Sequence, residues 1–285
     1  MRIDAHQHFW HYQAADYPWM TAAMKVLQRD YLPGDLAPLL DSHQLSGSIV
    51  VQARQCAAET EQLLRWADAS PATQAVIGWV NLRQSDLAAQ LEALRHPLLR
   101  GFRHQVQDER DPAAWLRDAA TASGINQLQR QRYVWEMLVT WRHLPETTRF
   151  AAHHDNHWLV LDHLGKPDIA AGAKSWRKQM AGLAAMPHVV CKLSGLVTEV
   201  LNPPWHAEQL RPFIEEAIAL FGPQRLMFGS DWPVCLLAAS YDEIVQLVEE
   251  VIGSLTPAEQ DNIWGDTAGR VYGLSGEQNG SIVAK

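Results

Sequence analysis

The sequence has few cysteines and no pattern that would pair them. Its three cysteines, Cys56, Cys191 and Cys235, lie far apart along the 285 residues, and no CxxC motif occurs. An odd number leaves at least one cysteine unpaired, and free thiols are typical of a reducing compartment. We therefore expect free thiols and a cytoplasmic location, and no disulfide framework.

The sequence also lacks an excess of positive charge. It has 24 Lys and Arg against 32 Asp and Glu, a formal net charge of −8. Nucleic acids and anionic membranes are bound through clustered lysines and arginines, so this balance argues against a general affinity for either. No apolar run approaches the roughly 18–20 residues that cross a bilayer, and the first residues have no secretory pattern. We expect neither nucleic acid nor a membrane as a partner.

Internal repeats, low-complexity linkers and a glycine-rich GxGxxG motif are absent as well. What the sequence does contain is 47% hydrophobic residues, with short apolar segments that alternate with amphipathic stretches of helical spacing. Near-continuous apolar strands that alternate with helices predict a parallel sheet buried on both faces. The eight expected strands are Arg2–Phe9, Gly47–Arg54, Ala75–Leu82, Leu99–Val106, Tyr133–Val139, Trp158–Gly165, Val189–Leu196 and Arg225–Pro233.

Eight such units in a chain of this length predict an α/β fold, a single-domain (β/α)8 TIM barrel. A doubly wound open sheet is the main alternative, which the missing GxGxxG motif weakens. We expect the barrel to span 1–274. The polar, glycine-bearing segment 275–285 is expected to be a flexible tail.

One connection is unusually long and aromatic. About three dozen residues separate the first expected strand from the second, and the segment of about 10–32 carries Trp10, Tyr12, Tyr17, Trp19 and Tyr31. Long loops at a barrel mouth often form a lid or a binding wall. The alternative is that these aromatic side chains only close one end of the barrel.

Polar side chains at the ends of the expected strands are few, and they matter because active sites in such barrels lie at the carboxyl ends of the strands. The first strand carries His6 and His8, which point to the same face because side chains alternate along a strand. Two imidazoles on an inward face can supply two ligands of a metal site. An HxH pair by itself is also common among unrelated core or surface histidines.

Two further strands end in polar residues. His163 follows the apolar run Val160-Leu161 and precedes Gly165, which puts it at the barrel rim. Asp231 follows a run of apolar residues, where a carboxylate is costly unless it is paired, hydrogen-bonded or bound to a metal. The competing interpretations are a satisfied core histidine and an aspartate that caps the next helix.

The fourth strand ends in Arg103 and His104, and alternation allows only one of them to face inward unless the strand is bulged. Either side chain could hold a substrate carbonyl or carboxylate, or could form a salt bridge outside the barrel. Arg54 is a further candidate for binding substrate. Cys235 lies near Asp231, but the sequence places no dedicated base beside it, which argues against a cysteine nucleophile.

Read together, the histidines of the first strand, one histidine of a middle strand and the aspartate of the last strand resemble the amidohydrolase superfamily. The resemblance runs from Met1 to about Tyr272 and is to the branch that hydrolyses sugar-acid lactones. The ordered set of motifs is more specific than HxH alone. The motifs that carry it are IDAHQHFW, LRGFRHQ, VLDHLGKP, VVCKLSGL and FGSDWPVC.

The resemblance implies a lactonase in which Asp231 acts as general base on a water held by His6, His8 and His163 or by an ion. It implies His6, His8, His163 and Asp231 as metal ligands, with zinc or manganese suiting such a set. Dinuclear members carry a bridging lysine on the fourth or fifth strand, and this sequence has none there. At most one divalent ion is therefore expected, and the same residues could also form a metal-free hydrogen-bonding cage.

The implied substrate is a small sugar lactone, whose ring we expect to stack on Trp10, Tyr31 and Trp232. Two other functions stay open from the sequence. A decarboxylase of a small aromatic acid would use the same barrel and an arginine such as Arg103 or Arg54 on the leaving carboxylate. A binding protein on an inactive barrel would not require polar residues at matching strand ends. We expect a monomer or a homodimer.

Overall fold

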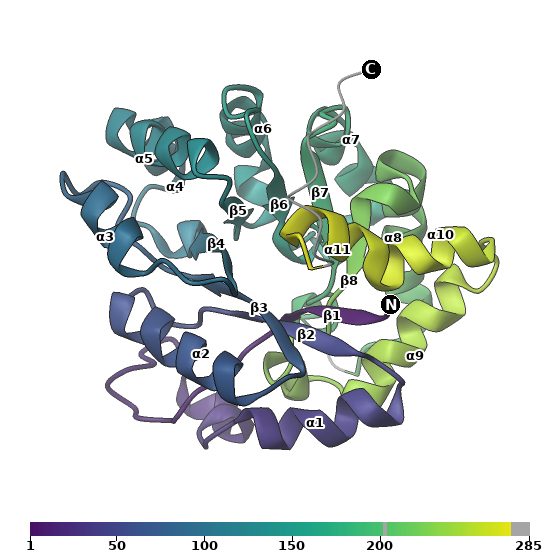
Figure 1. The fold of residues 1–285 in the computed structure, drawn as a ribbon. Coiled ribbons are helices and arrows are strands. Elements are labelled where there is room, and N and C mark those ends of the chain that lie inside the picture. Colours follow the sequence, from purple (N-terminus) through teal and green to yellow (C-terminus); the bar gives the residue numbers. More distant parts are fainter. Residues whose placement is uncertain (202–203, 275–285) are drawn as a thin grey trace.

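The computed structural model describes residues 1–201 and 204–274 of the chain. Eight parallel strands form one sheet in sequence order, and helices surround it (Figure 1). The chain is thus a single (β/α)8 barrel, as predicted. The strands are β1 Ile3–Gln7, β2 Gly47–Val51, β3 Thr73–Gly78, β4 Leu99–His104, β5 Val134–Met137, β6 Leu159–Leu161, β7 Val189–Leu193 and β8 Leu226–Phe228.

The helices cover the outside of this barrel. They are α1 Pro33–Ser42, α2 Ala57–Ala69, α3 Leu87–Ala93, α4 Pro112–Arg117, α5 Ala119–Arg130, α6 Leu144–Ala152, α7 Ala173–Ala184, α8 Ala207–Phe221, α9 Tyr241–Ile252, α10 Pro257–Asp261 and α11 Thr267–Tyr272. Each connects one strand to the next or follows the last one, which is why consecutive strands can lie parallel. None of the helices in the described part of the chain is long and apolar enough to cross a membrane.

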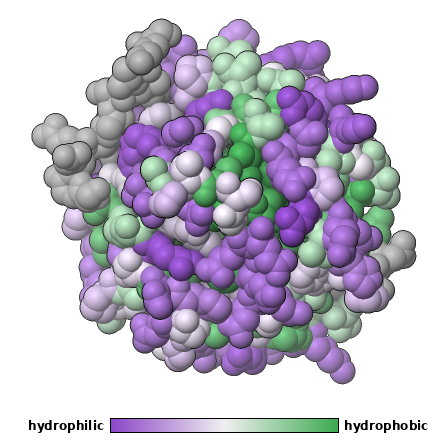
Figure 2. All heavy atoms as spheres, turned by 90° about the vertical axis from the view of Figure 1, so that its right-hand side faces the viewer, coloured by the Kyte–Doolittle hydropathy of each residue, from purple (hydrophilic) through white to green (hydrophobic). Residues whose placement is uncertain are grey.

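Helix α9 shows how the sequence sets the two faces of a covering helix. Ser240 caps it by accepting a hydrogen bond from the backbone N–H of Glu243, and Glu243 bonds back to the backbone N–H of Ser240. Seven of its side chains, among them Val245 and Val248, are buried, whereas the acidic ones point outward. Figure 2 shows the face on which α8, α9 and α10 lie, where hydrophilic side chains surround a central group of apolar ones.

The apolar core has two parts. The larger packs the outer side of the strands against the helices, and the smaller fills the barrel itself. Ile3, Val190 and Met227 belong to the interior part, which α11 closes with Val271 and Tyr272. In Figure 1 this last helix lies across the barrel. Because one end is filled, the open end at the carboxyl termini of the strands is left for polar side chains.

All eight predicted strands are confirmed, but each predicted strand extends further toward its carboxyl end than the observed one. The reason is visible at β6 (Leu159–Leu161), after which His163 and Leu164 have positive φ angles of 54° and 55°. Asp231, after β8, also has a positive φ of 58°. Residues in this left-handed region leave the extended conformation, so β6 ends before His163 and β8 ends before Asp231.

The aromatic segment 10–32 packs largely upon itself. Trp10 and Tyr31 exchange two backbone hydrogen bonds of 2.9 Å, and both side chains are buried. Tyr17 packs against Trp10, with 5.7 Å between the ring centroids. Trp19 is only half-buried, and it donates a hydrogen bond from Nε1 to the carbonyl of Ala53 after β2. Most of the aromatic side chains therefore close the barrel edge, and Trp19 reaches toward its mouth. The expected tail, 275–285, lies outside the described residues.

Candidate active site

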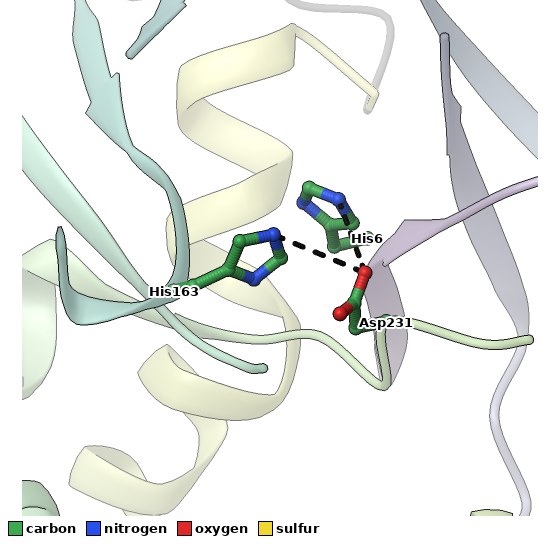
Figure 3. A group of neighbouring side chains, drawn as sticks. All are labelled: His6, His163 and Asp231. Atoms are coloured by element: carbon green, nitrogen blue, oxygen red, sulfur yellow. Dashed lines mark ion pairs between the residues drawn. The ribbon is translucent and has the colours of Figure 1, made fainter. Parts of the chain in front are cut away.

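Three side chains from three different strand ends meet at the barrel mouth. His6 belongs to β1, His163 follows β6 and Asp231 follows β8 (Figure 3). The Oδ1 atom of Asp231 lies 3.7 Å from Nε2 of His6 and 3.9 Å from Nε2 of His163. His8, just after β1, completes the group with its Nε2 3.3 Å from the same oxygen. The structure thus brings together the four side chains that the sequence places at strand ends.

A bulge in β1 aims His6 at this point. The register between β1 and β2 shifts between Asp4 and Gln7, so β1 contains one more residue there than the facing part of β2. Ala5 belongs to the apolar cluster of the barrel interior, and the next residue, His6, also contacts interior side chains. Asp4 faces the other way. Simple alternation correctly places His6 and His8 on the same face of the strand, but it would place Asp4 on that face as well.

Asp4 instead anchors the segment that carries Asp231. Its carboxylate accepts hydrogen bonds from the backbone N–H of Ser230 at 2.9 Å, the hydroxyl of Ser230 at 2.6 Å and the hydroxyl of Tyr241 at 3.1 Å. Burial raises the pKa of Asp4 to about 6, although these hydrogen bonds lower it. The backbone N–H of Asp231 in turn donates to the carbonyl of His6 at 2.8 Å. The two ends of the sheet are therefore joined next to the site.

Two glycines make room for the imidazole rings. A Cβ atom on Gly195 would lie 2.6 Å from Nδ1 of His163, and Gly195 also has a positive φ of 64°. A Cβ atom on Gly229 would lie 2.7 Å from the Cβ of His6. Real Cβ atoms do not approach other heavy atoms so closely, so the ring positions depend on these glycines.

Second partners fix the orientation of two of the rings. Nδ1 of His8 lies 2.7 Å from the carbonyl of Val51, which can only accept, so Nδ1 carries the proton. Nδ1 of His163 lies 2.8 Å from the hydroxyl of Ser194. In a neutral His8 ring the lone pair is then on Nε2, the atom that faces Asp231.

The pKa values favour neutral rings beside a charged carboxylate. Burial lowers the pKa of His8, and it lowers the pKa of His163 to about 4. Burial alone would raise the pKa of Asp231, but the surrounding imidazoles, His163 above all, hold it below its usual range. At neutral pH the group therefore consists of uncharged imidazoles around one carboxylate.

This arrangement fits a divalent metal ion. The lone pair on Nε2 of His8 faces a carboxylate oxygen at 3.3 Å, and two acceptors at that distance repel each other unless a cation or a proton lies between them. Ligands that share one zinc ion at about 2.0–2.2 Å lie about 3.3 Å or slightly more from one another. The separations of 3.3, 3.7 and 3.9 Å around Oδ1 are of this size. Neutral imidazole and carboxylate are also the donor types that zinc and manganese accept.

A layer of buried charges lies beneath this group. Lys192 on β7 is fully buried and pairs with Glu136 on β5 at 2.7 Å and with Asp162 at 3.4 Å. Arg103 on β4 pairs with Asp162 at 3.0 Å. Burial raises the pKa of Glu136 to about 7, although Lys192 opposes this shift. Burial would also raise the pKa of Asp162, but Lys192 and His6 hold it well below its usual range. The sequence can suggest that each of these charged side chains faces inward, but it does not predict which of them form ion pairs.

A cavity of about 370 Å³ opens above the group. His8, His163 and Asp231 lie at its floor, with Arg103 beside them. The remaining lining residues are both polar and apolar, and most of them come from connecting loops. They are Trp19, Met24, Ala53, Gln105, Gln107, Asp108, Leu138, Lys166, Thr198, Glu199, Val234 and Leu237.

Of the six residues predicted to bind substrate, only Arg103 lines this cavity. His104 points to the outside of the barrel, where its ring stacks on Trp115 at 4.6 Å and bonds to Glu109 at 2.7 Å. Arg54 pairs with Asp16 at 2.7 Å. Each of these side chains already has partners away from the cavity.

The three aromatic residues expected to stack on a sugar ring are also away from it. Trp10, Tyr31 and Trp232 are buried against one another, with 5.1 Å between the ring centroids of Tyr31 and Trp232. The hydroxyl of Tyr31 donates to the carbonyl of Val26, and Nε1 of Trp10 donates to that of Arg29. Trp19 is the aromatic residue of this segment that lines the cavity.

Comparison with known proteins places these features in a family context. The model of the family described as Amidohydrolase matches residues 3–274. An L-fucono-1,5-lactonase of Burkholderia multivorans is 51% identical over 96% of each chain. A second L-fucono-1,5-lactonase, from Burkholderia ambifaria, is 39% identical over 85% of this chain and 83% of its own.

Solved structures agree with these relatives. The crystal structure of an amidohydrolase from Burkholderia multivorans with bound zinc has a TM-score of 0.93 and 51% identity, and the match covers 96% of this chain and 99% of that one. A 2,6-dihydroxybenzoate decarboxylase from Rhizobium is also similar in structure, with a TM-score of 0.67. At 14% identity, that likeness is one of fold alone.

Proposed function

The chain belongs to the amidohydrolase family, and from this premise we propose that it hydrolyses the ring ester of a small sugar-acid lactone, of the L-fucono-1,5-lactone type. The observation that carries the proposal is the carboxylate of Asp231, which faces neutral imidazoles on the floor of the cavity. The two lactonases that are 51% and 39% identical support the substrate class.

In the proposed reaction, Asp231 is the general base. A water oxygen attacks the lactone carbonyl carbon while Asp231 takes one of the water protons. The bond between that carbon and the ring oxygen then breaks, and Asp231 returns the proton to the ring oxygen. The products are a hydroxyl group and a carboxylic acid, which releases its own proton at neutral pH.

The other groups at the floor orient the reactants. His163 is held by Ser194 and His8 by the carbonyl of Val51, so their Nε2 atoms are fixed toward the reacting region. We infer that Arg103, whose side chain lines the cavity, supplies positive charge that stabilises the oxyanion on the carbonyl oxygen. The three imidazoles and Asp231 would hold a divalent ion. When bound, such an ion supplies further polarisation of the carbonyl and acidifies the water.

The cavity walls suit a deoxy sugar. L-Fucono-1,5-lactone carries hydroxyl groups on one part of its ring and a methyl group on another. Gln105, Gln107 and Asp108 offer hydrogen-bonding partners for hydroxyls. Val234 and Leu237 offer apolar contacts for a methyl group.

A panel of aldonolactones with a pH indicator tests this function, because each turnover releases one proton. We expect the 1,5-lactone of a 6-deoxy sugar acid to react faster than the matched lactone that carries a hydroxyl at carbon 6. The assay is run with and without a chelator, and 2,6-dihydroxybenzoate is included with detection of carbon dioxide. No proton release from any lactone would overturn the proposal, and carbon dioxide release would replace it with decarboxylation.

A further inference from the structure

The ring of His6 lies between two cationic side chains. Its Nε2 atom is 3.2 Å from Nη1 of Arg103, and its Nδ1 atom is 3.1 Å from Nζ of Lys192. All three side chains are buried, His6 and Lys192 completely. A further positive charge on the ring between these two cations is strongly disfavoured, so the ring is neutral.

A neutral imidazole has one N–H and one lone pair, so it can accept from only one of these cations. On the Nδ1 side, Asp162 offers an acceptor for the ring N–H at 3.4 Å, and Lys192 has a second partner in Glu136. With the proton on Nδ1, the lone pair is on Nε2 and accepts from Arg103. This tautomer gives Arg103 and Asp162 compatible partners on His6. Lys192 donates to Glu136, and its 3.1 Å contact with the Nδ1–H is one between two donors.

The same lone pair is the one that a metal ion would need. A zinc–nitrogen bond is about 2.0–2.1 Å long, and Nη1 of Arg103 already lies in hydrogen-bonding position 3.2 Å from Nε2. One lone pair cannot serve both, and an ion there would also face the guanidinium charge at close range. Metal binding through His6 therefore requires Arg103 to give up this hydrogen bond.

Arg103 is held in place by other groups as well. Nη1 also donates to Asp162 at 3.0 Å, and Nη2 donates to the carbonyl of Gln52 at 2.5 Å. Moving the guanidinium would weaken these hydrogen bonds inside the barrel, where an unpaired charge is costly. The contact between Arg103 and His6 is therefore fixed by these hydrogen bonds, and a metal ion would have to displace a firmly held side chain.

We propose that the guanidinium of Arg103 competes with a divalent cation for the Nε2 lone pair of His6 and so limits the affinity of the site for metal. The inference rests on the donor set described for the proposed function, but it concerns ion binding and not turnover. A protein that binds zinc as proposed and hydrolyses no lactone would refute the function alone.

Calorimetric titration with zinc chloride tests the competition. Arg103→Gln removes the cation and is expected to bind zinc at least tenfold more tightly than the unaltered chain. Lys166→Gln is the matched control, because Lys166 lines the same cavity and carries the same charge but pairs with Glu199 and, in the described structure, has no contact with His6. We expect its affinity to rise less than threefold. Equal gains in both variants would show a general charge effect and overturn the proposal.

A double variant identifies the lone pair. In the His6→Gln background, Arg103→Gln should give no gain in zinc affinity, because the contested nitrogen is gone. A gain of the same size in that background would overturn the proposal. Circular dichroism checks folding of each variant. If Arg103→Gln does not fold, Arg103→Lys carries the test, since it keeps the charge near Asp162 but loses the fork geometry. Its expected gain is at least threefold, with the same dependence on His6.

Discussion

At the scale of single residues, Asp231 combines burial with a charge that the site needs. Its side chain is 6% exposed, and three imidazole nitrogens lie within 3.9 Å of its Oδ1 atom. Its left-handed backbone and the hydrogen bonds around Asp4 and Ser230 fix the direction in which the carboxylate points. A group held in this way can take a proton from water without first moving.

Asp231→Asn keeps the shape of this side chain and removes its basicity. We expect kcat to fall by at least about 100-fold, because general base catalysis typically contributes that much or more. The loss should appear in a proton-release assay with a lactone substrate, while the melting temperature stays close to that of the unaltered chain. A variant that retained more than a tenth of the activity would assign the base to another group, with the histidines as the first candidates.

The four residues at the centre of the site could be predicted from the sequence because each lies within or shortly after a strand. His6, His8, His163 and Asp231 need only the barrel topology to meet. The charge pairs beneath them could not be predicted in the same way. Whether Lys192 contacts Glu136 depends on the register of β5 through β7, which is not encoded locally.

At the scale of elements, the ends of the strands decide the site. The predicted strands overshoot because apolar residues continue past the last extended one, and nothing in a local pattern marks where φ turns positive. In the aromatic segment 10–32, Trp19 lines the cavity, whereas the predicted stacking residues Trp10 and Tyr31 do not, for a related reason. Aromatic side chains satisfy core packing and ligand stacking equally well, and here Trp10 and Tyr31 pack in the core.

The end of β7 offers a test of how tightly the ring of His163 is placed. Gly195→Ala would bring a Cβ atom to 2.6 Å from Nδ1 of His163. We expect kcat/KM to fall at least about tenfold as the ring is displaced, since small misplacements in a site can cost more than that. Gly172→Ala is the control, because its φ of 79° also strains an L residue, but no atom of the described residues lies within 4 Å of the added Cβ.

Both glycine variants should lose free energy of unfolding, of about 1–3 kcal/mol, because an L residue is strained at a positive φ. Only Gly195→Ala should also lose activity. Equal activity in the two variants would mean that the ring of His163 tolerates displacement, and its proposed role in orienting the reactants would have to be withdrawn.

The start of α2 contains a carboxyl group whose protonation affects stability. Glu59 accepts backbone hydrogen bonds from Ala53 and Arg54 on Oε2, while Oε1 has no partner. Burial raises its pKa from 4.5 to about 8, so the folded chain binds a proton that the unfolded chain has released. The contribution of this group to the free energy of unfolding is therefore complete below about pH 4.5 and is lost as the pH rises to about 8.

Glu59→Gln should remove this dependence, because the amide mimics the protonated acid. Urea unfolding at several pH values measures it. We expect the unaltered chain to lose stability relative to the variant by up to about 1.4 kcal/mol per pH unit between pH 5 and pH 8. Parallel curves for the two proteins would show that Glu59 is charged in the folded state throughout.

At the scale of the whole molecule, the charge layer inside the barrel limits how many ions it can hold. Besides the group around Asp231, the atoms of His6, Glu136 and Asp162 lie close enough together for a second ion. Lys192 occupies that place, with its Nζ within 3.4 Å of a ligand atom of each of them. The ammonium group supplies the positive charge that a second metal would bring.

We therefore expect at most one divalent ion per chain, and a modest loss of activity on chelation. Inductively coupled plasma mass spectrometry on protein dialysed against zinc measures the stoichiometry. Two ions per chain would require Lys192 to be displaced, and Glu136 would then be the first candidate for a bridging ligand. The cytoplasmic location and the monomeric or homodimeric state stay predictions from the sequence.

The joining of β1 to the segment after β8 has a consequence for how the protein is made. Synthesis proceeds toward the carboxyl terminus, so His6 leaves the ribosome 225 residues before Asp231. A polypeptide released early carries the imidazoles without the carboxylate, so premature termination yields no partly active product. For the same reason, turnover regained during refolding reports that the first and last strands have met, whereas a spectroscopic helix signal can recover earlier.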